Sequence, residues 1–309
     1  MIALTGYTGF VGRNLLNELE PKNVLLLGRK PLPESSNFSS FDLNETENLN
    51  LQDSLSAVDV LIHSAARVHI MNDSAVDPVA EFRAVNTLGT INLAKQAAQA
   101  GVKRFIFVSS VKVNGESTTN RLPFSSSDLP CAVDPYGISK AEAEMQLMAL
   151  GKETGMEIVI IRPPLVYGEG VKANFASLIK LVGKGLPLPF RGINKNKRSL
   201  VSVYNLIDLI KVCIDHPAAT NQTFLVSDDN DLSTAEIVSL MAKVQGKANL
   251  SLPVPVFFFN LAGKIFGKQS VVDRLVGSLQ VDIEHTKKTL NWHPPFSVED
   301  GFKLSTSRA

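Results

Sequence analysis

Short, continuously apolar runs alternate along the first half of the chain with longer segments of helical character. The apolar runs, which we expect to be strands, are residues 2–4, 23–28, 58–66, 104–110 and 157–163. Apolar spacing or residue propensity predicts helices at residues 11–19, 75–100 and 136–154. Strands that are apolar throughout are buried on both faces, and their alternation with helices is typical of a parallel sheet covered on both sides. The sequence therefore predicts an α/β fold with a doubly wound parallel sheet, which binds ligands at the carboxyl ends of its strands.

After Pro163 the pattern changes to loop-rich stretches separated by short helices. Loops dominate residues 163–175 and 185–200, and helices are expected at about 174–184, 205–215 and 233–246. This pattern predicts a smaller, interleaved C-terminal α/β lobe laid over the sheet. We therefore divide the chain into a first domain, residues 1–163, to which some later segments return, and a second lobe made mainly of residues 164–309.

Charge and cysteine usage exclude several classes of protein. Lysine and arginine number 31 against 30 aspartates and glutamates, so nothing in the overall charge suggests a nucleic-acid or anionic-membrane partner. Cys131 and Cys213 lie far apart, and the five histidines show no ligand spacing, so we expect neither a disulfide framework nor a metal site. No signal peptide and no apolar run of membrane-spanning length is found, which favours a soluble, cytoplasmic protein.

One apolar stretch, Leu252 to Phe266, stands apart from the others. Its sequence, LPVPVFFFNLAGKIF, is interrupted by two prolines near its start. We expect a buried or interface segment there, with contact to a membrane as the less favoured alternative.

The stretch TGYTGFVG, residues 5–12, carries glycines at positions 6, 9 and 12, directly after the first expected strand and at the start of a helix. Gly6 permits the turn, Gly9 lets the backbone approach a pyrophosphate, and Gly12 lets helix and strand pack closely. The helix N-terminus offers unpaired N–H groups and a partial positive charge to phosphates. The residues predict a Rossmann-type dinucleotide site, with an ordinary tight turn as the alternative.

Eight motifs in order give the chain its resemblance to a known family. They are residues 5–12, 41–43 (FDL), 63–66 (HSAA), 85–90 (VNTLGT), 136–140 (YGISK), 162–168 (RPPLVYG), 197–210 and 290–301. With them the chain resembles the extended short-chain dehydrogenase/reductase family, and within it the nucleotide-sugar epimerases and reductases. The resemblance covers nearly the whole chain and implies an NAD(P)-dependent enzyme.

The resemblance implies a catalytic triad of Ser110, Tyr136 and Lys140. Tyrosine and lysine four positions apart share one face of a helix, so Lys140 can hold its ammonium near the Tyr136 phenol. A free phenol has a pKa of about 10, and a nearby ammonium together with an oxidised nicotinamide would lower it. Ser110 ends a strand and would hydrogen-bond the same substrate oxygen. The alternative is an ordinary surface tyrosine and lysine on a helix.

The residues after Ser110 narrow the reaction. Sugar 4,6-dehydratases of this family carry an Asp-Glu pair there, whereas this chain has Val111 and Lys112. These side chains cannot provide paired carboxylates for water elimination, so dehydration is not expected. Hydride transfer at a carbinol carbon is left, in one direction for a reductase or in both for an epimerase.

The end of the second strand bears on the choice of dinucleotide. NAD-binding relatives place an acidic residue there for the ribose 2′-hydroxyl, but this chain has Gly28, Arg29 and Lys30. An arginine near that ribose suits a 2′-phosphate, so NADP(H) is slightly favoured over NAD(H) unless both cations only face solvent. The resemblance places these positions along the dinucleotide: Gly6, Thr8, Gly9, Phe10, Val11, Gly12, Arg29, Lys30, Asp42, Leu43, Ala65, Ala66, Asn86, Tyr136, Lys140, Pro163 and Val166.

Substrate recognition is expected mainly from the second lobe. The family presents an arginine to the nucleotide diphosphate, which Arg198 matches; Asn174 matches a residue near the diphosphate or sugar, and Arg274 lacks a firm motif. Arg67 and Lys112 complete the substrate set. Arg198 could instead be one exposed cation among several in NKNKR, and Asn174 a helix N-cap.

These observations favour reduction of a UDP-4-keto-hexose, with Tyr136 as the acid. The alternative is a UDP-glucose-type 4-epimerase with bound NAD, and a more remote one is a protein that senses a dinucleotide without catalysis. The segments 75–100 and 136–154 resemble those through which relatives pair as homodimers, although their apolar faces could serve the sheet alone.

Overall fold

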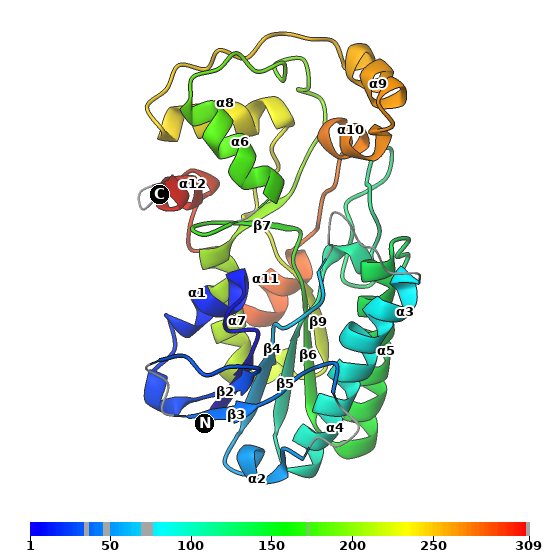
Figure 1. The fold of residues 1–309 in the computed structure, drawn as a ribbon, viewed down its shortest axis with the longest axis vertical. Helices are drawn as coiled ribbons and strands as arrows, with labels where there is room; N and C mark the ends of the chain where they lie inside the picture. The colour runs from blue at the N-terminus through cyan, green and yellow to red at the C-terminus, as the bar shows by residue number, and fades with distance from the viewer. Residues whose placement is uncertain (34–36, 46–49, 69–76, 172, 307–309) are drawn as a thin grey trace.

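Seven parallel strands form the central sheet of the computed structural model, which describes residues 1–33, 37–45, 50–68, 77–171 and 173–306, without the side chains of residues 173 and 174. The strands lie in the order β3-β2-β1-β4-β5-β6-β9 (Figure 1). Their bounds are β1 (Ile2–Thr5), β2 (Val24–Gly28), β3 (Phe38–Ser40), β4 (Val60–His63), β5 (Arg104–Val108), β6 (Glu157–Arg162) and β9 (Gln222–Leu225). Ile2 pairs with Val24 on one side and Val60 on the other, so the strand order reverses at β1. The predicted doubly wound α/β fold is confirmed.

Helices cover both faces of the sheet and create two apolar layers. One face packs against α1 (Phe10–Leu16), α7 (Val203–Asp215) and α11 (Glu284–Leu290). The other packs against α2 (Gln52–Leu55), α4 (Thr90–Gln99) and α5 (Pro135–Thr154). Because α7, β9 and α11 come from the second half of the chain, the lobes interleave across the expected boundary at residue 163.

The single helix expected over residues 75–100 is divided, within the described residues, into segments of different helical type. It consists of α3 (Pro78–Phe82), the π-helical segment η2 (Arg83–Gly89) and α4; residues 75 and 76 lie outside the described part. Short 3-10 turns occur at η1 (Pro21–Asn23), η3 (Val111–Val113) and η4 (Pro217–Ala219). The sequence interpretation did not identify β3 or β9, because both are edge strands of only three or four residues.

The second lobe has its own apolar centre. It contains α6 (Ala173–Gly183), α8 (Thr234–Val244), α12 (Val298–Thr306) and a small sheet of β7 (Leu165–Tyr167) with β8 (Leu200–Ser202). Tyr167, Phe175 and Phe302 are buried together there. Two further helices, α9 (Val256–Ile265) and α10 (Gln269–Val276), lie at the end of the lobe away from the central sheet (Figure 1).

The position of α9 corrects one sequence expectation. Phe257 is 67% exposed and Phe266 74%, and Phe258, Leu261 and Ile265 are exposed beside them. Leu252 to Phe266 is therefore not a buried segment, since only the side of α9 that faces α10 is covered. No helix among the described residues combines the length and apolar character needed to cross a bilayer.

Candidate active site

Ser110, Tyr136 and Lys140 meet at the carboxyl end of β5. Ser110 follows that strand, and its side chain hydrogen-bonds the Tyr136 phenol. Lys140 lies one turn further along α5, and its Nζ donates to the Val108 carbonyl oxygen at 3.0 Å. That Nζ is 6.0 Å from the centre of the Tyr136 ring. The structure thus brings the three predicted catalytic residues together.

Burial shifts the pKa values of Tyr136 and Lys140. For Tyr136, burial is the largest cause of a rise in pKa to about 12. The charge of Asp134 adds to this rise, and the hydrogen bond from Ser110 opposes it. Burial also lowers the pKa of Lys140 to about 7, against the opposing charge of Glu144. The sequence argument expected a nearby ammonium to lower the pKa of Tyr136. In the protein alone burial raises this pKa instead, and Lys140 is not among the groups that shift it.

Lys140 lies over an aromatic ring that also contacts a buried histidine. Its Nζ lies 4.2 Å from the centre of the Phe107 ring, and His63 stacks on Phe107 with ring centres 5.8 Å apart. The His63 nitrogens contact the hydroxyls of Thr5 and Thr90 at 2.7 and 2.9 Å. Burial, and secondarily the charge of Lys140, keeps the pKa of His63 well below its usual range. A buried, neutral histidine therefore packs against the ring that Lys140 contacts.

A buried ion pair that the sequence reading missed supports the same helix. Arg162 Nη2 donates to Glu144 Oε2 at 2.6 Å, and its Nη1 donates to Asn114 Oδ1 at 3.1 Å. Ser109 Oγ donates to Glu144 Oε1 at 2.5 Å. Glu144 lies one helical turn after Lys140 on α5, and Arg162 is the first residue of the motif RPPLVYG. The sequence signal for this pair is therefore the arginine at the start of that motif.

The glycine loop has the shape that a pyrophosphate site requires. Gly6 adopts φ +72°, and a Cβ there would lie 2.6 Å from the Ala65 amide nitrogen. A Cβ on Gly12 would lie 2.2 Å from the Gly6 carbonyl oxygen, so only glycine permits this contact between helix and turn. Gly9 and Thr8 are exposed, and among the described residues no side chain caps the start of α1. These features fit a dinucleotide, whose phosphates would meet the amides of Phe10, Val11 and Gly12.

Tyr7, in the glycine loop, contacts the turn after β2, which carries the predicted dinucleotide-binding residues Arg29 and Lys30. Its hydroxyl donates to the Lys30 carbonyl oxygen, and a Cβ on Gly28 would lie 2.7 Å from the same hydroxyl. Arg29 and Lys30 are both exposed at this turn. Asp42 and Leu43 follow the neighbouring strand β3, where Asp42 Oδ1 accepts from the Asn44 amide at 3.0 Å. The sequence reading had not assigned a role to Tyr7.

Asn86 holds the segment after β4. Its Oδ1 accepts from the Arg67 amide at 2.8 Å, and its Nδ2 donates to the Arg67 carbonyl and to Ser139 Oγ at 3.0 and 3.1 Å. The buried Asn86 therefore ties the Ala65–Arg67 segment to α5. Arg67, expected near the substrate, lies 5.5 Å from the centre of the Phe82 ring and 3.7 Å from Glu81.

Pro163 and Val166, the last two expected dinucleotide positions, follow β6. The Pro163 carbonyl oxygen accepts from the Val111 amide at 2.9 Å, which joins this segment to the turn after Ser110. Val166 lies in β7 and is half-buried. The two residues thus border the catalytic group from the side of β6.

Arg198, predicted at the substrate diphosphate, and Arg274, predicted in the substrate site without a firm motif, lie together although 76 residues separate them. Arg198 Nη1 donates to the Arg274 carbonyl oxygen at 3.1 Å. Burial first, and then the positive charge of Arg274, lowers the pKa of Arg198, while Glu116 raises it. Two cations this close favour an anionic ligand between them. Asn174 lies in the first turn of α6, and its side chain is outside the described residues.

Lys112 connects the catalytic group with these arginines. It forms ion pairs with Asp134, which caps the start of α5 two residues before Tyr136, and with Glu116 at 3.0 Å. Glu116 in turn influences Arg198. Three of the expected substrate residues, Lys112, Arg198 and Arg274, are thus linked to one another through Glu116, and Lys112 is linked to the start of α5 through Asp134; Arg67 takes no part in these contacts.

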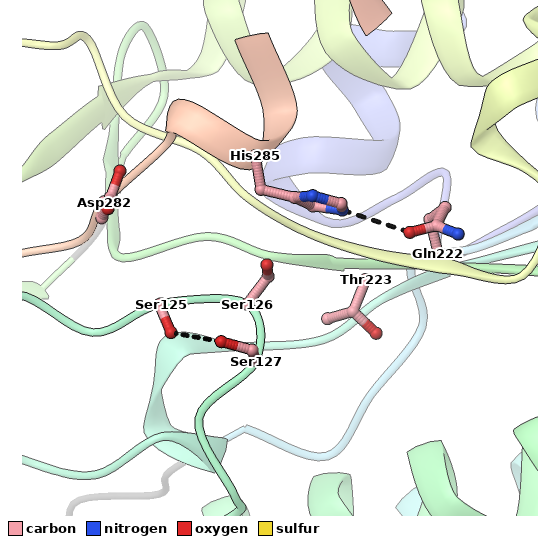
Figure 2. A pocket seen from close by; sticks show the side chains of 7 residues that line it. All are labelled: Ser125, Ser126, Ser127, Gln222, Thr223, Asp282 and His285. Atoms are coloured by element: carbon pink, nitrogen blue, oxygen red, sulfur yellow. Dashed lines mark hydrogen bonds between the residues drawn. The ribbon is translucent and has the colours of Figure 1, made fainter. Parts of the chain in front are cut away.

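A separate cavity of about 410 Å³ lies beside the edge strand β9 (Figure 2). Its lining residues are Ser125, Ser126, Ser127, Gln222, Thr223, Asp282 and His285. His285 Nε2 and Gln222 Oε1 lie 3.1 Å apart across one side of it. No residue of the catalytic group or of the glycine loop belongs to this lining, so we do not place the chemistry there.

Comparisons with known proteins agree with this geometry. The sequence model of the NAD dependent epimerase/dehydratase family matches residues 2–227. A UDP-glucose 4-epimerase of Vibrio cholerae is 53% identical over 98% of this chain and 93% of its own length. The chain therefore belongs to the NAD-dependent epimerase/dehydratase family of enzymes, and the resemblance to nucleotide-sugar enzymes of the extended short-chain type is confirmed.

Two more distant proteins are also similar to this chain. N-acetyl-α-D-glucosaminyl-diphospho-ditrans,octacis-undecaprenol 4-epimerase of Escherichia coli O157:H7 is 28% identical over 88% of this chain and 82% of its own length. The crystal structure of UDP-glucose 4-epimerase from Thermotoga maritima with UDP-glucose superposes with a TM-score of 0.77. It is 22% identical and the match covers 98% of this chain and 96% of that one. The latter likeness concerns the fold.

Proposed function

We propose that this enzyme is a 4-epimerase of a UDP-hexose that works with bound NAD. The 53% identity to the Vibrio cholerae UDP-glucose 4-epimerase, which extends over nearly the whole chain, carries this proposal. It favours the alternative that the sequence analysis placed second. The hydrogen-bonded pair Ser110–Tyr136, with Lys140 beside it, supplies the acid–base group that oxidation and reduction at a sugar carbon need.

The residues of the site divide the work as follows. When bound, the nicotinamide supplies the carbon that accepts and returns a hydride, together with a positive ring charge. That positive charge would favour the Tyr136 phenolate, which would take the proton of the sugar 4-hydroxyl and later return it, while Ser110 would orient that oxygen. The glycine loop binds the pyrophosphate of the dinucleotide. Arg198 and Arg274 bind the diphosphate of the sugar nucleotide, which holds the sugar beside Tyr136.

Reduction of a UDP-4-keto-hexose with NADPH is the second candidate. It is favoured by the exposed Arg29 and Lys30 after β2, where a carboxylate would suit the ribose of NAD better. Arg29→Ala should then weaken NADPH binding about ten- to a hundredfold, the effect of one charged hydrogen bond, and NADH binding much less. Lys22→Ala, at an exposed position before β2, is the matched control. Equal losses for both dinucleotides would show that Arg29 only faces solvent.

Two parallel assays separate epimerisation from reduction. Purified protein is mixed with UDP-glucose without added dinucleotide, and UDP-galactose is measured by chromatography; in parallel, a UDP-4-keto-6-deoxyhexose is supplied with NADPH or NADH and the dinucleotide absorbance is followed. Conversion of UDP-glucose by the protein alone supports the epimerase. Dinucleotide oxidation only in the second assay would replace it with the reductase.

The group to which the substrate sugar is attached, UDP or a lipid diphosphate, is a further part of the proposal. The Escherichia coli relative is named for a sugar on undecaprenol diphosphate. Because α10 carries Arg274 and packs against α9, the helix with the exposed apolar side chains lies next to the helix that carries one of the diphosphate arginines. We therefore include a polyprenyl diphosphate sugar as an alternative substrate, to be offered in detergent beside the UDP-sugar.

A further inference from the structure

The outer side of α9 carries a set of apolar side chains that the fold leaves uncovered. This α9 face consists of Phe257, Phe258, Leu261, Ile265 and Phe266, all exposed. Their spacing puts the first four on one side of the helix. The opposite side is packed: Phe259 stacks on Phe190 at 6.1 Å, and a Cβ on Gly263 would lie 2.8 Å from Val272. The rigid contact with α10 therefore fixes the apolar side outward.

Two exposed lysines, Lys264 and Lys268, lie on and just after α9, and residues 248–272 contain no aspartate or glutamate. The first carboxylate after this segment is Asp273 on α10, which accepts from Gln269 Nε2 at 2.8 Å. The nearly balanced charge of the whole chain conceals this cationic segment. Aromatic and aliphatic side chains interspersed with lysine suit the boundary between headgroups and acyl chains of an anionic bilayer.

We propose that the α9 face docks on the surface of an anionic lipid bilayer. The ten residues of α9 are too few to span a bilayer, so the helix would lie in the interface plane. It stands at one end of the long axis of the molecule (Figure 1), where a flat surface can reach it. Docking would bring Arg274 on α10, and Arg198 beside it, close to the headgroup layer.

A second copy of the chain fits this face less well. A twofold contact through α9 would place Lys264 and Lys268 of both protomers in one interface. Residues 248–272 offer no carboxylate to pair with them, and Asp273 is already hydrogen-bonded to Gln269. An anionic headgroup layer supplies that charge, so it is the occupant to which we commit. The proposal does not depend on which sugar the enzyme converts.

Vesicle flotation tests the proposal. The full chain is floated with vesicles of phosphatidylcholine alone and of phosphatidylcholine mixed with phosphatidylglycerol. We expect binding to the mixed vesicles that weakens as salt is raised. The double variant Lys264→Glu with Lys268→Glu should lower the partition coefficient at least about tenfold, since each lysine near an anionic surface contributes roughly fivefold. Phe258→Ser with Ile265→Ser should abolish flotation.

A matched control uses apolar residues exposed elsewhere. Leu122 is 82% and Leu129 86% exposed, so Leu122→Ser with Leu129→Ser removes similar apolar surface outside α9 and should leave flotation unchanged. Thermal unfolding of every variant confirms that it is folded, and conversion of soluble UDP-sugar is measured on the same samples. Failure of the wild type to convert any UDP-sugar would overturn the proposed function and leave the docking result standing.

Three outcomes would overturn the docking proposal. The first is a wild type that does not float with the mixed vesicles. The second is an equal loss of flotation in the Leu122 and Leu129 control. The third is a doubled mass by light scattering that Phe258→Ser with Ile265→Ser abolishes, which would assign the α9 face to a second copy of the chain.

Discussion

Glu144 and Arg162 form a buried ion pair directly beneath the proposed catalytic helix face, with Nη2 and Oε2 2.6 Å apart. The pair joins α5 to β6, and the Glu144 charge also raises the pKa of Lys140 against the effect of burial. The contact thus links the stability of the sheet–helix packing to the protonation of a proposed catalytic residue.

Glu144→Gln should destabilise the protein markedly. Removal of one partner leaves the Arg162 charge buried without its carboxylate, which costs about 3–5 kcal/mol. The control is Glu142→Gln, two residues earlier, where a more exposed pair with Arg83 should contribute at most about 1 kcal/mol. Both are measured by urea unfolding. Equal losses would mean that the buried pair is no more important than the surface pair.

Tyr136→Phe should reduce turnover about a hundredfold or more, because it removes the phenolic proton carrier and keeps the ring. The affinity for the dinucleotide, measured by calorimetry, should change little. Tyr204→Phe, a half-buried tyrosine on α7, serves as the control. Turnover within a few-fold of the wild type would exclude Tyr136 as the acid and base.

Stability should depend on pH through Lys140. Burial lowers the pKa of Lys140 to about 7 in the folded protein, whereas a free lysine has about 10.4. Between these values the unfolded chain binds more protons, so the free energy of unfolding rises with pH across that window. In Lys140→Met this rise should be smaller. Lys152→Met, exposed on the same helix, should keep the wild-type slope; identical slopes in all three proteins would contradict the lowered pKa.

Arg198→Ala should raise the Michaelis constant for the UDP-sugar about ten- to a hundredfold through loss of a charged hydrogen bond to phosphate. It should also weaken product inhibition by UDP, which retains the diphosphate, and leave dinucleotide binding nearly unchanged. Arg191→Ala, exposed in the same lobe, is the control. If the variant loses dinucleotide affinity and keeps its response to UDP, Arg198 belongs to the cofactor site.

We also predict a homodimer through α4 and α5. Leu88 and Met145 are 57% and 68% exposed on this side of the molecule, which suits a twofold contact. Light scattering should give twice the chain mass at micromolar concentration, and Met145→Glu should reduce it. Leu129→Glu, in an exposed loop outside α4 and α5, should not. A monomeric wild type would assign the apolar faces of these helices to the sheet alone.

The sequence by itself determined the features that depend on local chain geometry. The glycines at 6 and 12 predict their turn because a Cβ at Gly6 would lie 2.6 Å from the Ala65 nitrogen and a Cβ at Gly12 2.2 Å from the Gly6 carbonyl oxygen. Tyr136 and Lys140 were paired correctly in space because helical periodicity places residues four apart on one face. Buried strands were readable since a strand covered on both sides is apolar throughout.

Only the tertiary structure decided contacts between residues far apart in the chain. Nothing in the local pattern places Arg198 beside Arg274, Glu144 against Arg162, or Asn86 on the backbone of Arg67. Nor does periodicity distinguish an apolar helix that is buried from one that faces outward, as α9 does, because both satisfy the same spacing. Which side of such a helix is covered depends on what packs against it, and that is fixed when the whole chain folds.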